Sequence, residues 1–212
     1  MKAKFWSELL GTAFLMMIVA GSGIMAQNLF PGQNGLALLA NSIATGAGLF
    51  VLIQCLEPIS GCHINPVVSL VEFLKGRLSK KDFGVYVCAQ VMGAYIGVIL
   101  THLMFNQEVF QQASVDRSGL NIFISEIIAT FGLISVIALA GKKHVEFAPI
   151  SIAAYITSAY WFTSSTSFAN PAVTFGRMFT DTFAGLNPEF FPMFLCAQLI
   201  GALAAFLLLR RY

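Results

Sequence analysis

Charged residues are scarce in this chain of 212 residues. Only 10% of the sequence is charged, with 12 lysines and arginines against 10 aspartates and glutamates, whereas 57% is hydrophobic. Soluble globular domains are about one quarter charged, so the composition excludes that class and indicates a protein of the lipid bilayer. The net charge of +2 says little about partners, and nucleic-acid binding is not predicted because the basic residues follow membrane topology.

Cysteine and histidine are also rare. The four cysteines stand at positions 55, 62, 88 and 196, and the three histidines at 63, 102 and 144. This spacing matches no metal site and gives no disulfide framework, so neither a metal nor another cofactor is expected. An enzyme is not predicted either, because the hydroxyl residues 164–167 have no histidine near them in sequence. Proximity in space stays open at this point.

Apolar runs bounded by polar or turn-forming residues predict six membrane-spanning helices. They lie at about 5–26, 35–56, 82–105, 120–140, 147–166 and 188–210. Because no alternating barrel pattern appears, the fold class is an all-α membrane protein, with residues 1–212 as a single domain. The first run could also be a secretory signal peptide, since lysines precede it and small residues follow it.

The basic residues predict the orientation of the chain in the membrane. Six spans place four basic groups on one side, which the positive-inside rule assigns to the cytoplasm together with both termini; the expected location is the inner membrane of the cell. Arg117 and Arg177 fall toward the outer face. The four groups are Lys2 and Lys4; Lys75, Arg77, Lys80 and Lys81; Lys142 and Lys143; and Arg210 and Arg211.

An internal repeat argues against a signal peptide. The sequence from Ser7 to Thr12, SELLGT, is echoed from Ser125 to Thr130 as SEIIAT, and the stretch CAQVMGA at 88–94 as CAQLIGA at 196–202. The two copies cover about 1–106 and 119–212, and each reads as span, span, short helix, span. Three spans per copy is an odd number, so the second copy must enter the membrane upside down relative to the first.

Two Asn-Pro motifs begin the short helices. Asparagine is a strong N-cap and proline a favoured first helical residue, so Asn65-Pro66-Val67 and Asn170-Pro171-Ala172 predict half-helices at about 66–75 and 171–180. In an inverted repeat their positive N-termini meet near the bilayer midplane, where they oppose cations and protons. The capping amides then keep NH2 donors for a neutral hydroxylated solute. The alternative is that each motif begins an ordinary loop helix.

Taken together, these motifs resemble the aquaporin (major intrinsic protein) family over nearly the whole chain. The resemblance implies a bundle of six spans and two re-entrant half-helices, assembled as a homotetramer with one pore per subunit. It also implies that Glu8 and Glu126 bind backbone groups of the re-entrant loops. A proton relay is the other interpretation of these intramembrane carboxylates.

The family's four-residue filter can be located by counting from the asparagines. The count gives Thr45, Ser158, Ser167 and, where arginine is usual, Val173. An offset of one would replace Ser158 by Thr157. Without the arginine, the filter is expected to be wide and mildly polar.

Such a filter predicts a passive channel for water and small neutral hydroxylated solutes. Glycerol-like polyols are one class, and metalloid hydroxides such as arsenite are another, because the chain resembles arginine-free bacterial members associated with arsenic resistance. A water-selective aquaporin and an ion-coupled secondary transporter remain as alternatives. The transporter would need titratable or ion-coordinating groups at the midplane, where this chain has two amides.

Three further residues have two interpretations each. Arg177, one turn after Val173, either lies at the outer mouth and attracts anionic solutes such as oxyanions, or binds carbonyls at the end of its helix or pairs with Asp181. Cys62 either borders the pore or is a small packing residue. His63 either titrates near neutral pH or packs in the first loop.

Overall fold

The computed structural model describes residues 1–143 and 145–210, and these contain helices but no strand. Its two halves have the same order of elements. In the first half, α1 (Lys2–Leu29) and α2 (Asn34–Ser60) are followed by the short α3 (Pro66–Leu74) and by α4 (Lys80–Met104). In the second half, α5 (Leu120–Lys143) and α6 (Ala148–Phe162) precede the short α7 (Pro171–Arg177) and α8 (Phe191–Leu209). Two 3-10 turns, η1 (Val145–Phe147) and η2 (Pro188–Phe190), begin α6 and α8.

Five of the long helices are long and apolar enough to cross a membrane by themselves. The fifth predicted span is shorter than expected, because α6 has only 15 residues and ends at Phe162 rather than near 166. The chain turns extended at Thr163 and enters the second re-entrant loop. A 15-residue helix rises about 22 Å, and the preceding 3-10 turn adds roughly 6 Å, so the segment still approaches the ~30 Å of a hydrocarbon core.

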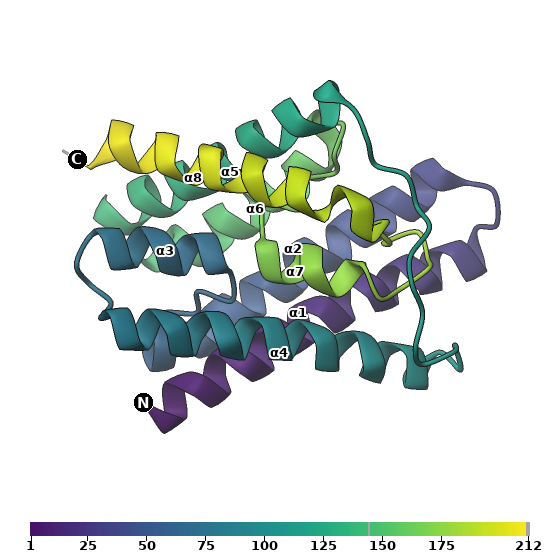
Figure 1. Ribbon diagram of the computed structural model, residues 1–212, viewed down its shortest axis with the longest axis horizontal. Coiled ribbons are helices and arrows are strands. Elements are labelled where there is room, and N and C mark those ends of the chain that lie inside the picture. Colours follow the sequence, from purple (N-terminus) through teal and green to yellow (C-terminus); the bar gives the residue numbers. More distant parts are fainter. Residues whose placement is uncertain (144, 211–212) are drawn as a thin grey trace.

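The two half-helices lie between the long ones. In Figure 1, α3 and α7 run end to end between α8 and α4, and their N-termini face each other near the middle of the molecule. The helix α7 ends at Arg177, three residues before the predicted end, whereas α3 ends at Leu74 close to prediction. All-α architecture with two re-entrant half-helices is therefore confirmed, and the division into repeats at 106 and 119 stays a prediction.

Small residues allow the long helices of each half to pack closely. A Cβ atom added to Gly93 of α4 would lie 2.3 Å from the carbonyl oxygen of Leu9 on α1. Gly201 is the corresponding glycine of α8, and a Cβ atom added to it would lie 2.4 Å from the carbonyl oxygen of Ile127 on α5. Close approach through small residues is typical of helices that associate in membranes.

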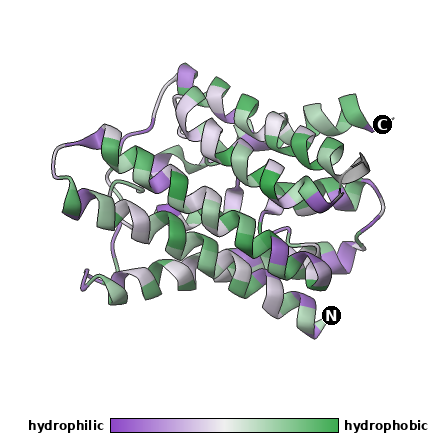
Figure 2. Cartoon of the chain, turned by 180° about the vertical axis from the view of Figure 1, so that it is seen from behind, coloured by the Kyte–Doolittle hydropathy of each residue, from purple (hydrophilic) through white to green (hydrophobic). Residues whose placement is uncertain are grey.

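The outer surface is apolar along the helices and polar at their ends. Figure 2 shows hydrophobic residues along the helical ribbons and hydrophilic ones mostly toward the ends of the bundle. Large side chains such as Trp6, Phe14 and Trp161 are more than half exposed. This is the pattern of a bundle surrounded by lipid.

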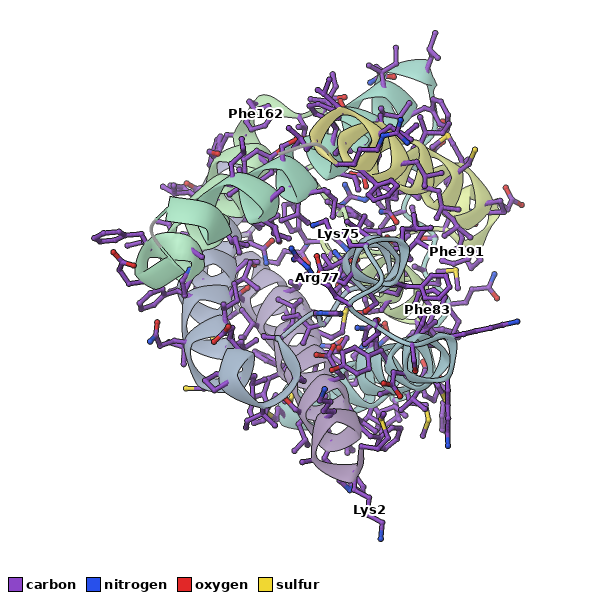
Figure 3. The ribbon with its side chains drawn as sticks, turned by 90° about the vertical axis from the view of Figure 1, so that its left-hand side faces the viewer. Lys2, Lys75, Arg77, Phe83, Phe162 and Phe191 are labelled. Carbon is purple, nitrogen blue, oxygen red and sulfur yellow. The ribbon has the colours of Figure 1, made fainter. Side chains whose placement is uncertain are left out.

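One end of the bundle carries the N-terminus, the C-terminal end of α8 and several of the basic residues. Lys2, Lys75 and Arg77 all lie at this end, which we call the terminal end (Figure 3). Lys75 and Arg77 form ion pairs with Glu72, at 2.9 and 3.2 Å. Of the other basic residues in the orientation argument, Arg211 and the side chains of Lys142 and Lys143 lie outside the described residues. The opposite end, where the connections 105–119 and 178–187 meet, is called the loop end.

Candidate functional site

A buried carboxylate anchors the first re-entrant loop. Glu8 of α1 has no exposed surface, and its oxygens accept hydrogen bonds from the backbone N–H groups of His63 (2.9 Å) and Ile64 (2.6 Å). The hydroxyl of Ser60 and the side-chain amide of Gln90 also donate to it, at 2.6 and 2.7 Å. Its four donors leave Glu8 fully engaged with the loop and its neighbours.

Glu126 of α5 makes the equivalent contacts in the second half. It is also fully buried and accepts from the N–H groups of Phe168 and Ala169, both at 2.9 Å, and from the side-chain amide of Gln198 at 2.8 Å. The nitrogen of Gln198 also donates to Thr174 of α7 at 2.9 Å. Backbone donors without water must find acceptors inside the protein, and these two carboxylates supply them. This geometry supports a loop-anchoring role over a proton relay.

The two asparagines cap their own half-helices and also join the two loops. The side-chain oxygen of Asn65 accepts from Val67 N at 3.1 Å, and that of Asn170 from Ala172 N at 3.0 Å and Val173 N at 3.3 Å. Asn65 Nδ2 donates to the carbonyl of Ala169, and Asn170 Nδ2 to that of Ile64, both at 2.8 Å.

This exchange corrects the expectation that both amide hydrogens of each asparagine face the lumen. An amide has two N–H donors, so one donor per asparagine is used between the loops and one remains for a solute. Both asparagines line the cavity described below.

The backbone before each asparagine is strained in the same way. Cys62 and Ile64 have φ of 45° and 40°, and the matching Ser167 and Ala169 have 50° and 46°. Left-handed conformations of this kind are uncommon for residues other than glycine and cost about 1–3 kcal/mol each, so the surrounding contacts must hold them. The exchange between the two loops depends on this conformation, because Ile64 and Ala169 supply the accepting carbonyls.

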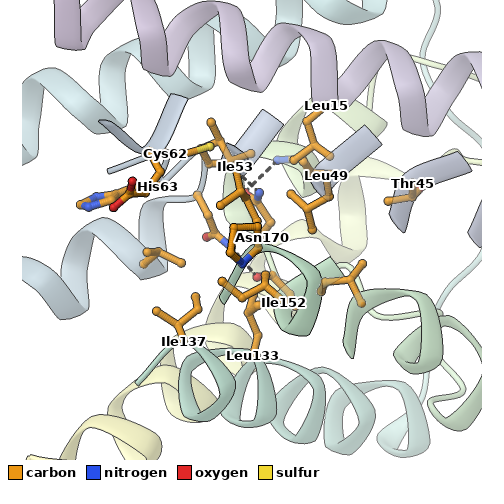
Figure 4. A pocket seen from close by; sticks show the side chains of 18 of the residues that line it. Leu15, Thr45, Leu49, Ile53, Cys62, His63, Leu133, Ile137, Ile152 and Asn170 are labelled. Atoms are coloured by element: carbon orange, nitrogen blue, oxygen red, sulfur yellow. Dashed lines mark hydrogen bonds between the residues drawn. The ribbon is translucent and has the colours of Figure 1, made fainter. Parts of the chain in front are cut away.

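A cavity of about 500 Å³ runs beside the two asparagines. Its wall comes from four of the long helices, α1, α2, α5 and α6, from both re-entrant loops and from both half-helices. In Figure 4, Thr45 lies toward one end, Cys62 and His63 toward the other, and Asn170 between them. The leucine, isoleucine and valine residues that the helices contribute to the wall are Leu15, Val19, Leu49, Ile53, Val68, Leu133, Ile137, Ile152, Ile156 and Val173.

Three of the four predicted filter residues line this cavity: Thr45, Ser167 and Val173. Ser158 does not. It lies on the exposed face of α6, and its hydroxyl donates to the Tyr155 carbonyl at 2.7 Å.

Ser158 misses the cavity because of the helical period. The cavity face of α6 carries Ile152, Ile156 and Tyr160, which are spaced by four residues, and Ser158 is about 200° around the helix from the last two. Thr157, the alternative, is not in the wall either; its hydroxyl lies where a side chain on Gly46 of α2 would be.

Tyr160 is the α6 residue that lies beside Thr45. Its hydroxyl is 3.1 Å from Thr45 Oγ1, so the ring is held against α2. Counting from Asn170 missed it, although the spacing of Ile152, Ile156 and Tyr160 was a signal present in the sequence. The wall therefore contains an aromatic side chain that the predicted filter lacked.

Arg177 also lies in the cavity wall and is only 2% exposed. Its guanidinium carbon is 3.4 Å from the centre of the Phe168 ring, and its Nε donates to the carbonyl of Ala184. Asp181 is not its partner, because that carboxylate accepts from Ser114 N and Oγ, each at 2.8 Å. Arg177 thus binds a carbonyl, although that of a following loop rather than one at the end of its own helix, and it also lines the cavity. The wall therefore has valine at position 173 and an arginine one turn farther along α7, and the arginine-free filter stays a prediction.

Cys62 and His63 line the terminal half of the cavity. The thiol of Cys62 is buried and donates to the Leu52 carbonyl at 3.4 Å. His63 Nδ1 is 3.0 Å from Ser69 Oγ, and its ring lies 5.0 Å from that of Tyr86. No group of three or more possible metal ligands occurs in the part of the chain that the structure describes.

Two opposed half-helices with a cavity beside their caps, inside an apolar bundle, define a membrane channel for small solutes. The model of the major intrinsic protein family matches residues 1–166, and the chain belongs to this family. The matched residues include Asn65 and end just before Asn170. The chain is accordingly a multi-pass membrane channel for water and small solutes and not an enzyme.

Relatives of known name agree with this assignment. Aquaglyceroporin AqpS of Rhizobium meliloti (strain 1021) is 49% identical over 204 residues, which cover 96% of this chain and 87% of that protein. The glycerol uptake facilitator protein of Bacillus subtilis (strain 168) is 26% identical over 157 residues, 67% of this chain and 57% of that protein. The X-ray structure of the aquaglyceroporin from Plasmodium falciparum matches with a TM-score of 0.74 at 22% sequence identity. The match covers 97% of this chain and 94% of the Plasmodium chain, and it confirms the fold.

Proposed function

We propose that the chain conducts small neutral hydroxylated solutes as well as water: glycerol-like polyols and metalloid hydroxides such as arsenite. The observation that carries this proposal is Val173, which lines the cavity one turn into α7 where the family usually has an arginine. Val173 adds an apolar side chain to the wall that also contains Asn65 and Asn170. A polyol has one edge of C–H groups and one of hydroxyls, and such a wall suits both edges.

The same geometry supports exclusion of protons and cations. The N-termini of α3 and α7 meet beside the cavity, and each contributes roughly half a positive charge. The terminal end is proposed to face the cytoplasm of the inner membrane, on the basis of its basic residues. Glu8 and Glu126 are proposed to support the loops, Cys62 and His63 to border the path, and the assembly to be a homotetramer as the family resemblance implies.

A water-selective channel is the second candidate, and Tyr160 and Arg177 favour it. Both side chains lie in the loop half of the wall, where an aromatic ring and a guanidinium would narrow the path. Their contacts argue against full closure, because Tyr160 is held by Thr45, and Arg177 is held by Phe168 and the Ala184 carbonyl. Flux measurements separate the two candidates.

The experiment is stopped-flow flux of water, glycerol and arsenite into vesicles that contain the purified channel. Under the proposal, the wild-type channel passes water, glycerol and arsenite down their concentration gradients, and proton or sodium gradients do not change these fluxes. Val173→Arg is expected to suppress glycerol and arsenite more than water, and Val173→Leu, which adds volume without charge, is the matched control. Wild-type flux of water alone would support the second candidate, and equal loss of all three solutes, or no change, would contradict the role of Val173.

A further inference from the structure

The guanidinium of Arg177 is a buried charge without a carboxylate. Arginine stays protonated in proteins, and burying an unpaired charge is costly. The ion pairs among the described residues are those of Glu72 with Lys75 and Arg77, so none involves Arg177. Its described hydrogen bond is from Nε to the Ala184 carbonyl, which leaves the fork of terminal N–H donors available.

Glu126, the carboxylate that anchors the second re-entrant loop, already accepts hydrogen bonds from other groups. Its two oxygens accept from Phe168 N, Ala169 N and the Gln198 amide. A second guanidinium adds to the positive charge rather than reducing it: Arg117, from the connection 105–119, has its central carbon 5.2 Å from the centre of the same Phe168 ring. The loop half of the cavity is therefore positively charged.

A second residue of the same wall, Ser167, also has an unused hydrogen-bonding group. Ser167 is 4% exposed and lines the cavity with Arg177. Its Oγ makes no hydrogen bond to any residue that the structure describes, although buried hydroxyls are normally paired. An unpaired hydroxyl and the unused terminal N–H groups of a guanidinium, both from residues of one wall, suit a ligand that accepts hydrogen bonds.

The carboxylates of the wall lie away from this position. Glu57 and Glu146 are in the terminal half, whereas Arg177 and Ser167 are in the loop half. An anion is thus favoured at the loop end and opposed at the terminal end.

We propose that the loop half of the cavity holds a binding site for a small oxygen-bearing monoanion, formed by the guanidinium of Arg177 and the hydroxyl of Ser167. A planar oxyanion or carboxylate fits the fork of the guanidinium through two parallel hydrogen bonds. The bound anion occupies the solute path and slows the flux of neutral solutes. This inference deepens the proposed function, because it assumes that the same cavity is the path.

Two measurements test the site, with formate and nitrate as probes and chloride as the reference anion at constant ionic strength. The first is the thermal unfolding midpoint of the purified channel, since a ligand that binds only the folded state raises it. The second is glycerol flux in vesicles. In the wild type, formate and nitrate are expected to raise the midpoint and to lower the flux, and chloride to do neither.

The variants separate the site from general charge effects. Arg177→Gln is expected to abolish both responses, and Ser167→Ala to weaken formate binding about tenfold, as expected for one hydrogen bond to a charged group. Arg117→Gln removes the same charge from the neighbouring arginine, which does not line the cavity, and is expected to change formate binding less than about threefold. If Arg177→Gln does not fold, Arg177→Lys keeps the charge without the fork and should lose the preference for formate over chloride.

Formate and chloride acting alike on the wild type, or Arg177→Gln responding like the wild type, would overturn the site. A wild type that passes no glycerol would instead contradict the proposed function. In that case the unfolding midpoint still decides whether the anion binds.

Discussion

Replacing Glu126 by glutamine removes one acceptor from the second re-entrant loop at nearly constant volume. The two carboxylate oxygens accept separately, Oε1 from Phe168 N and Oε2 from Ala169 N, each at 2.9 Å. A carboxamide has a single acceptor oxygen, and its NH2 group would face the other backbone donor. We expect Glu126→Gln to loosen the loop that presents Asn170.

The size of this effect follows from the contacts. One buried N–H without an acceptor costs about 1–3 kcal/mol, and the two hydrogen bonds that remain lose charge assistance worth about 1 kcal/mol each. The free energy of unfolding should therefore fall by about 3–5 kcal/mol. For a chain of this length each kcal/mol corresponds to roughly 2–4 °C, so the unfolding midpoint should fall on the order of 10 °C.

The assay is thermal unfolding of the purified channel, followed by water and glycerol flux in vesicles at a temperature where the variant is folded. Glu108→Gln is the matched control, because Glu108 is exposed in the connection after α4. We expect several-fold lower flux of both solutes for Glu126→Gln and wild-type behaviour for the control. If both variants unfolded within about 2 °C of the wild type and conducted fully, the anchoring role of this carboxylate would be wrong.

Three other predictions follow from single contacts. Gly93→Ala should lower the free energy of unfolding by about 1–3 kcal/mol, because its methyl group would meet a backbone oxygen of α1 at 2.3 Å. Gly84→Ala, whose methyl group would have nothing within 4 Å, should be neutral or slightly stabilising in the same thermal assay. Hydrogen bonds from the backbone and hydroxyl of Ser114 lower the pKa of Asp181 below its ordinary 3.8. That contribution to stability is fully present above the ordinary pKa and is lost as pH falls through the lowered one. Hydrogen exchange of Ser114 should therefore stay slow at pH 5 in the wild type and become fast there in Asp181→Ala, which removes the accepting oxygen. Tyr160→Ser should raise glycerol flux relative to water by widening the wall, while Tyr160→Phe, which keeps the ring, should not; equal ratios for both would contradict its place in the path.

The half-helices could be predicted from sequence because their origin is local. Asn65 and Asn170 cap the residues that immediately follow them, and the proline at the next position fixes the start of each helix. The number of long helices could be predicted for the same kind of reason, since hydrophobic length is a property of each segment. The ends of α6 and α7 were less predictable, because the chain leaves each helix to make contacts with distant segments.

The α6 residue of the wall was missed because its position was counted across a loop. Between Phe162 and Asn170 the backbone takes left-handed conformations at Thr166, Ser167 and Ala169, so a fixed offset does not determine which face of α6 is inward. The helical spacing within α6 is independent of that loop and indicates Tyr160 rather than Ser158. The contacts made by Arg177 were beyond either argument, because its two partners come from separate loops.

The two halves share a scaffold but differ in charge at one repeated position, which lines the cavity only in the second half. Seven residues after each asparagine, the first half has Glu72, which is neutralised by two basic neighbours at the terminal end. The second half has Arg177 at that position, stacked on Phe168 and without a carboxylate among the described residues. The backbone is repeated in the two halves, but this charge is not. The loop half of the cavity is therefore more positive than the terminal half, a difference that the symmetric fold alone would not produce. Selection among solutes by charge should therefore depend on the loop half, and selection by the capping amides on the centre.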